Sequence, residues 1–158
     1  MIKFFIANKD TVLKEYTEFS QKMEELLKKG YPEIIRTDLE SLAANLPPIL
    51  RMSVPNFKES SVREGATYAR WALTIATAQI RAYRAEKGTL PSNLAALSEI
   101  GVTPQEDPFS NHMLKYIFRG NSATLYSIGP DLISNGGKPE YDPKNGTVSP
   151  GDIAVNVR

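Results

Sequence analysis

Oxygen-bearing side chains gather in one glycine-rich stretch of this 158-residue chain, between residues 129 and 151. Carboxylates and amides on such a backbone are the hard oxygen donors that calcium prefers. The donors are Asp131, Ser134, Asn135, Glu140, Asp142, Asn145 and, directly after the stretch, Asp152. We predict a calcium site in which Asp131 and Asp152 supply charge, Asn135 or Asp142 assists, and carbonyls near Ile128 and Ile133 complete the shell. The alternative is a solvated loop whose Asp and Asn side chains cap turns.

The length of this loop favours an organising ion. About 20 residues without regular structure is long for a compact domain, and residues 132–150 offer no apolar core to offset the lost chain entropy. An ion that bridges the two ends of the loop would order it. A site with so few charges should bind weakly, on the order of 0.1–1 mM, which suits an extracytoplasmic location and not the cytosol.

Most other site chemistry is excluded by composition. The chain has no cysteine and a single histidine, His112, so it has no disulfide, thiolate zinc site, cysteine nucleophile or two-imidazole site. His112 is expected to be an exposed turn residue. Glu106 and Asp107 are adjacent, and neighbouring side chains of an extended chain point apart, so they form a poor acid–base pair. No phosphate-binding loop or nucleophile elbow occurs. We expect a non-catalytic protein, although acids distant in sequence can meet in space.

The charge balance argues against nucleic acid and membrane partners. The chain carries 19 Lys and Arg against 18 Asp and Glu, a net charge of +1. A stripe that mixes arginine with neutral threonine is predicted to be a solvated helix face; it comprises Arg63, Thr67, Arg70, Thr74, Thr77, Arg81 and Arg84. No apolar run reaches the ~20 residues of a membrane span. Met1–Ala7 is apolar but short, and we interpret it as the start of a strand or helix.

Two amphipathic helices are predicted in the N-terminal part. The first covers residues 11–29, with apolar side chains three and four apart, Asp10 or Thr11 as its cap and Gly30 as its stop. The second follows Pro32 and ends before Pro47. Residues 47–60 are interpreted as a connector.

A long central helix is predicted from Val62 to Lys87, with Ser61 and Glu64 as a capping box and Gly88 as its stop. It has two apolar faces. One comprises Val62, Ala66, Ala69, Leu73, Ala76, Ile80 and Tyr83, and the other Trp71, Ile75, Ala78, Ala82 and Ala85. We expect the N-terminal helices to cover one face and a C-terminal sheet the other, with Tyr68, Trp71 and Tyr83 in the core.

The hydrophobic period changes to two after Gly88, which indicates strands. Residues 113–118 and 123–128 form a hairpin around the Arg119–Ser122 turn, and residues 153–157 can add a third strand. The predicted fold class is α+β: a long helix on a three-stranded antiparallel sheet, with additional N-terminal helices. Residues 1–60 form the helical segment and residues 61–158 the α+β module, together in one compact unit.

Four blocks in order resemble the major pseudopilins of type II secretion. The first runs from Tyr83 through Gly88 and Pro91 to Leu97, like the family's helix end followed by a short leucine-rich helix. The others are residues 107–111 (Asp-Pro-Phe-Ser-Asn), residues 125–131 (Leu-Tyr-Ser-Ile-Gly-Pro-Asp) and residues 151–153 (Gly-Asp-Ile). The family has Asp-Pro-Trp-Gly-Asn, Tyr-Ser-Leu-Gly-Ala-Asp and an acidic pair with Ile in these places. The resemblance covers about residues 66–154.

The resemblance implies a structural role in protein transport, with self-association or protein partners, and calcium bound in the matching loop. Only Asp131 and Asp152 match the family's positions there. The chain departs from the family at its start, where some 60 amphipathic residues stand in place of an apolar assembly segment. It is also similar to bacterial proteins in which such a module follows other sequence, often behind a membrane anchor. We therefore expect an extracytoplasmic structural or assembly module, and the second similarity implies that it is the soluble part of a membrane-anchored protein. The alternative is a soluble domain whose N-terminal helices bind a peptide or partner helix.

Overall fold

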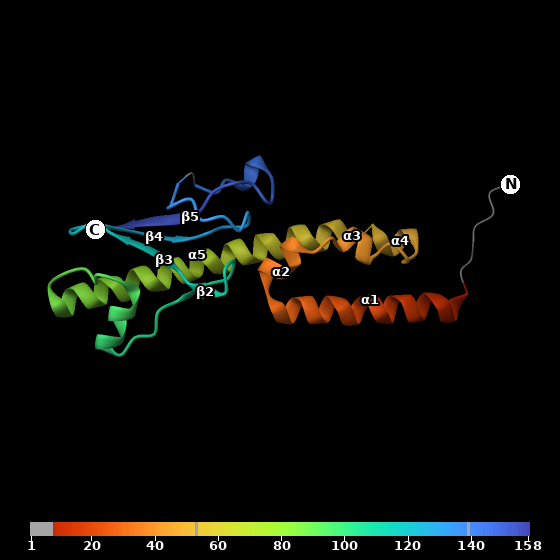
Figure 1. Cartoon of the computed structure of the whole chain (residues 1–158), viewed down its shortest axis with the longest axis horizontal. Coiled ribbons are helices and arrows are strands. Elements are labelled where there is room, and N and C mark those ends of the chain that lie inside the picture. Colours follow the sequence, from red (N-terminus) through yellow and green to blue (C-terminus); the bar gives the residue numbers. More distant parts are fainter. Residues whose placement is uncertain (1–7, 53, 139) are drawn as a thin grey trace. The chain divides into compact units, whose positions relative to one another are not determined.

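The computed structural model describes residues 8–52, 54–138 and 140–158, so the interpretation of Met1–Ala7 lies outside the described residues. The chain divides into two compact units, Met1–Ser61 and Val62–Arg158. Helix α5, Val54–Lys87, contributes its first turns to the first unit and the rest to the second (Figure 1). Each unit is described by itself.

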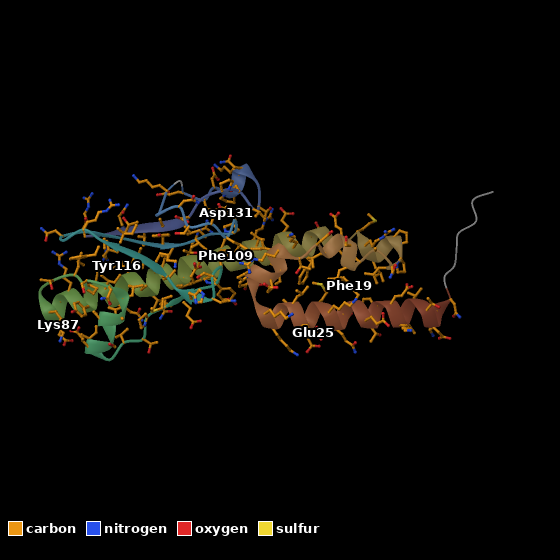
Figure 2. All side chains as sticks on the ribbon, in the orientation of Figure 1. Phe19, Glu25, Lys87, Phe109, Tyr116 and Asp131 are labelled. Atoms are coloured by element: carbon orange, nitrogen blue, oxygen red, sulfur yellow. The ribbon has the colours of Figure 1, made fainter. Side chains whose placement is uncertain are left out.

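The first unit is helical, as predicted. It contains α1 (Lys9–Lys29), α2 (Tyr31–Arg36), α3 (Leu39–Leu42), α4 (Pro48–Arg51) and the start of α5. Asn8 caps α1 by accepting a 3.1 Å hydrogen bond from the Asp10 amide, so the predicted caps Asp10 and Thr11 are wrong. Phe19 packs against the core of this unit (Figure 2), which consists of Met23, Leu26, Ile34, Leu39, Ala43, Leu46 and Val54.

Two predictions for this unit are wrong. The single helix after Pro32 is divided, because Thr37 is extended and the Asp38 carboxylate accepts from the Ser41 amide to cap α3. The connector over residues 47–60 is largely helical, with α4 and the first turns of α5. Pro55 is the second residue of α5, where a backbone N–H has no helical partner and proline is tolerated. Ser61 is therefore a buried residue inside the helix and not its cap.

In the second unit, one of the two apolar faces predicted for α5 is buried. Its residues Val62, Ala66, Ala69, Leu73, Ala76, Ile80 and Tyr83 are all at most 9% exposed. The many alanines let the covering layer approach the helix axis closely. The helix ends as expected at Gly88, whose amide donates to the Arg84 carbonyl and whose φ of 77° is the left-handed conformation that glycine adopts without strain.

The sheet confirms the α+β prediction. After the 3₁₀ helix η1 (Leu94–Ile100), β1 (Glu106–Asp107) pairs with β2 (His112–Met113). The strands β3 (Lys115–Phe118), β4 (Ala123–Ser127) and β5 (Ile153–Val157) form an antiparallel sheet in that order, which lies along α5 (Figure 1). The largest side chains of this core that solvent does not reach include Phe109, Leu97, Leu125 and Val157.

The other apolar face of α5 is not core. Tyr68, Trp71 and Ile75 are 54%, 62% and 44% exposed. The prediction that Tyr68 and Trp71 are core residues is therefore wrong, whereas Tyr83 is buried as predicted. The residues of this face are apolar, but the sheet of this unit covers the opposite side of the helix.

The single tryptophan makes this exposure measurable. We expect the fluorescence of Trp71 to be quenched readily by iodide, and Trp71→Ala to change the free energy of unfolding by less than about 1 kcal/mol, because a surface substitution loses little packing. Leu97→Ala is the matched core truncation, with an expected loss of about 2–5 kcal/mol. Slow quenching together with a large loss for Trp71→Ala would place Trp71 in a buried contact.

Candidate functional site

The candidate site is the loop between β4 and β5, which leaves the sheet at the end where Figure 2 labels Asp131. Asp131 ties the start of this loop to its end. Its Oδ2 accepts a 3.1 Å hydrogen bond from the Gly151 amide, and its Oδ1 accepts a 3.0 Å bond from the Ile133 amide. The Gly151 amide therefore joins the two ends of the loop through Asp131, and the predicted ion bridge stays a prediction.

Asp152 is the buried centre of the loop. Solvent does not reach it, and its Oδ2 accepts from the amides of Asn135 at 3.0 Å and Gly137 at 2.6 Å. Its carbonyl accepts from the Tyr141 amide at 2.9 Å, so three parts of the loop converge on one residue. Burial raises the pKa of the Asp152 carboxyl, the two amides partly offset this, and the negative charges of Asp131 and Asp107 raise it further.

Asp107 is the functional-site residue that sequence reasoning missed. It is fully buried, and its carboxylate accepts from the Ser127 hydroxyl at 2.6 Å, the Ile128 amide at 3.1 Å and the Phe109 amide at 3.0 Å. Glu106 is exposed whereas Asp107 is buried, so the two neighbouring side chains lie on opposite sides of the strand, as expected. The available signal was the Asp-Pro-Phe turn, since Asp side chains often accept from the amide two residues on.

The other two predicted ligands have different roles. Asn135 contributes its backbone amide to Asp152, while its side-chain amide donates to the Ile133 carbonyl. Asp142 caps the short helix η2 (Pro143–Asn145) by accepting from the Lys144 amide at 2.9 Å. The structure thus brings together Asp131, Asp152 and the unpredicted Asp107, and it uses Asp142 elsewhere in the loop.

This arrangement does not fit calcium as it stands. Calcium needs a shell of oxygen atoms, whereas amide N–H groups occupy the Asp131 and Asp152 carboxylates and direct positive hydrogens at them. Over residues 8–52, 54–138 and 140–158, no cluster of three or more His, Cys, Asp or Glu residues is arranged to hold a metal ion. In this structure the partners of the two carboxylates are the chain's own amides. Calcium binding stays a prediction.

The calcium prediction can be tested directly. If the amides alone order the loop, thermal unfolding in millimolar calcium and in chelator should coincide, and Asp131→Ala should lower both midpoints equally because it removes the bridge to Gly151. A higher midpoint in calcium that Asp131→Ala abolishes would instead establish the ion site.

The raised pKa of Asp152 gives an independent test. A folded-state pKa above the ordinary value of 3.8 means that the folded protein binds this proton more tightly than the unfolded chain. The contribution of Asp152 to stability is therefore largest below the unfolded pKa and is lost as the pH rises through the folded pKa. We expect the stability difference between wild type and Asp152→Ala to grow from about pH 7 to about pH 4, as measured by urea unfolding.

A control carboxylate in the same loop is available. Asp142→Ala removes the cap of η2 and is the matched control for the loss of a loop carboxylate. A calcium site predicts the opposite trend for Asp152, because its carboxylate must be ionised to bind the metal. A difference that shrinks towards low pH would contradict the raised pKa of Asp152.

The remaining predicted features are located as follows. His112 is exposed, although it lies in β2 and not in a turn. The arginine and threonine stripe is mostly exposed, and Thr67, Thr74 and Thr77 donate their hydroxyls to carbonyls four residues earlier. This confirms the prediction of a solvated face. In the part of the chain that the structure describes, no helix combines the length and hydrophobicity of a membrane span.

Comparisons with known proteins returned no match, whether to family models, to curated proteins or to solved structures.

Proposed function

We propose that residues 62–158 form a non-catalytic structural or assembly module of the pseudopilin type, in an extracytoplasmic bacterial protein that serves protein transport. One observation carries the proposal. Blocks that are separate in the sequence and resemble the family are joined by hydrogen bonds: Asp107 to Ser127 and Ile128, and Asp131 to Gly151. The blocks therefore form one structural unit at the end of the sheet, as expected if this module has the same fold as the pseudopilins.

An assembly module also needs a surface for its neighbour. The exposed face of α5 with Tyr68, Trp71 and Ile75 supplies one, since aromatic side chains and above all tryptophan dominate the energy of protein interfaces. These three large apolar side chains lie within about two turns on one side of the helix, and exposed apolar patches mark interaction sites.

The absence of cysteine allows a direct test by cross-linking, because an introduced thiol is unique. Ile75→Cys should form disulfide-linked dimers under mild oxidation at protein concentrations where Phe118→Cys stays monomeric. The two positions are matched, at 44% and 41% exposed, but Phe118 lies on β3. Adding Trp71→Ser to Ile75→Cys should suppress the dimer. Equal cross-linking of both cysteine variants would contradict self-association through this face.

A second candidate function rests on the first unit. An apolar groove of about 370 Å³ runs along α1 and the start of α5, and Phe19, Met23, Leu27 and Phe57 are among its lining residues. Leu27 is 53% exposed in it, and Tyr16, also in the lining, is 49% exposed. An amphipathic helix seats its apolar face in grooves of this kind. We expect Leu27→Ser to weaken binding of the apolar dye anilinonaphthalene sulfonate if this groove is a binding site, and Leu13→Ser, outside the lining, to leave it unchanged.

A further inference from the structure

Strand β5 leaves part of one edge of the sheet open. The strand order is β3-β4-β5, so only one side of β5 is paired with β4. Just before β5 begins, the other side of the chain is covered, because the Tyr141 backbone amide donates to the Asp152 carbonyl. Because successive residues of a strand direct their backbone groups to opposite sides, Ala154 and Asn156 direct theirs outward as Asp152 does. Among the described residues, neither has a backbone partner on that side.

A groove runs beside this open edge. Its volume is about 770 Å³, within the usual range for binding sites, and α5 forms its other wall. The middle of the groove is apolar or carries only hydroxyls. Apart from two arginines, the lining consists of Leu73, Thr74, Thr77, Ala78, Ile153, Ala154 and Val155.

Two arginines give the groove its charge. Arg70 and Arg81 belong to its lining, both are exposed, and the lining contains no acidic residue. Within the described residues neither arginine takes part in an ion pair. They lie eleven positions apart on α5, which corresponds to about 16 Å along the helix axis at ~1.5 Å per residue. An extended chain covers that distance in about five residues.

We propose that this groove binds an extended acidic segment of a partner protein, which adds to β5 as a fourth strand. Its backbone pairs with Ala154 and Asn156, its small apolar side chains contact α5, and two carboxylates about four residues apart meet Arg70 and Arg81. A second copy of this chain is a poor occupant, because edge-to-edge pairing would bring four arginines together without an acid in either lining. The inference goes beyond the assembly proposal and does not depend on it, since it uses a different surface.

The test uses the full chain and a fluorescein-labelled synthetic peptide about seven residues long, with valine and threonine between two glutamates about four residues apart. Fluorescence anisotropy should detect binding that weakens as salt is raised. Arg70→Glu combined with Arg81→Glu should weaken it by about tenfold or more, because two attractive contacts become repulsive. Arg84→Glu is the matched control: it makes the same charge change on an exposed residue of α5 outside the groove, and it should leave affinity nearly unchanged.

Two modified peptides test the mode of binding. Replacing both glutamates with lysine should abolish binding, and methylating alternate backbone amides should do so too, because strand addition needs those donors. The proposal is overturned if the acidic peptide does not bind, if the lysine peptide binds equally, or if the methylated peptide binds as well as the parent. It is also overturned if sedimentation velocity detects a dimer that Arg81→Glu alters and the acidic peptide does not displace, since the occupant is then a second copy.

Discussion

Replacing Asp107 with alanine is expected to destabilise the protein by about 3–5 kcal/mol, because three buried donors lose their acceptor at once. The donors are the Ser127 hydroxyl and the amides of Ile128 and Phe109. The loss also reaches Gly129, whose amide donates to the Ser127 oxygen. Urea unfolding followed by the fluorescence of Trp71 measures this loss of stability, since Trp71 is the single tryptophan of the sequence and lies in the second unit.

Two variants separate this mechanism from a general charge effect. Glu106→Ala removes the neighbouring exposed carboxylate and should cost less than about 0.5 kcal/mol. Asp107→Asn keeps one acceptor oxygen at the same place, so its loss should lie between those of Glu106→Ala and Asp107→Ala. If the free energy of unfolding of Asp107→Ala lies within about 1 kcal/mol of the wild-type value, the hydrogen bonds of Asp107 do not hold the turn between β1 and β2 to the end of β4.

The elements that sequence analysis predicted well are those with a strong local pattern. The buried face of α5 repeats at helical spacing and ends at a glycine, and the hairpin of β3 and β4 alternates around a short turn. Strand β5 was predicted to join the sheet, and it pairs with β4 in an antiparallel register. In these places local propensity and tertiary packing favour the same conformation.

The failures occurred where two local signals compete. The connector predicted over residues 47–60 contains Pro55, but proline is also tolerated in the first turn of a helix, and α5 begins at Val54. Asp38 interrupts a continuous apolar pattern because its side chain caps a new helix. Trp71 and Tyr68 lie on an apolar stripe, yet periodicity alone does not say whether the rest of the chain buries that stripe.

The candidate site was half predictable for a similar reason. Asp131 and Asp152 bracket a long loop, so their proximity followed from the two strands they adjoin. The contact of Asp107 with residues 127 and 128 depends on how the β1 turn docks on the sheet, which residue spacing does not contain. Nor does composition distinguish a carboxylate that binds a cation from one that accepts backbone amides, because both uses select the same residue types.

The second large effect is expected at Gly129, where β4 ends and the loop begins. Its φ is 73°, and a Cβ added there would overlap the carbonyl oxygen of Gly151. Gly151 also donates its amide to Asp131, so the two ends of the loop are held at a separation that leaves no room for a methyl group. Gly129→Ala should therefore destabilise the second unit by about 2–4 kcal/mol, the sum of left-handed backbone strain and overpacking, measured by urea unfolding.

Gly136 is a closely matched control for this prediction. It lies in the same loop and has the same φ of 73°, but no atom lies within 4 Å of the place its Cβ would take. Gly136→Ala should show only the backbone strain, about 1–2 kcal/mol. The additional loss of unfolding free energy in Gly129→Ala then measures the close approach of the two ends of the loop. Combining Gly129→Ala with Asp131→Ala should cost less than the sum of the two single losses, because both substitutions disrupt the same contact between the loop ends. Equal losses for the two glycine variants would mean that the ends of the loop separate freely, and that neither amides nor an ion hold them together.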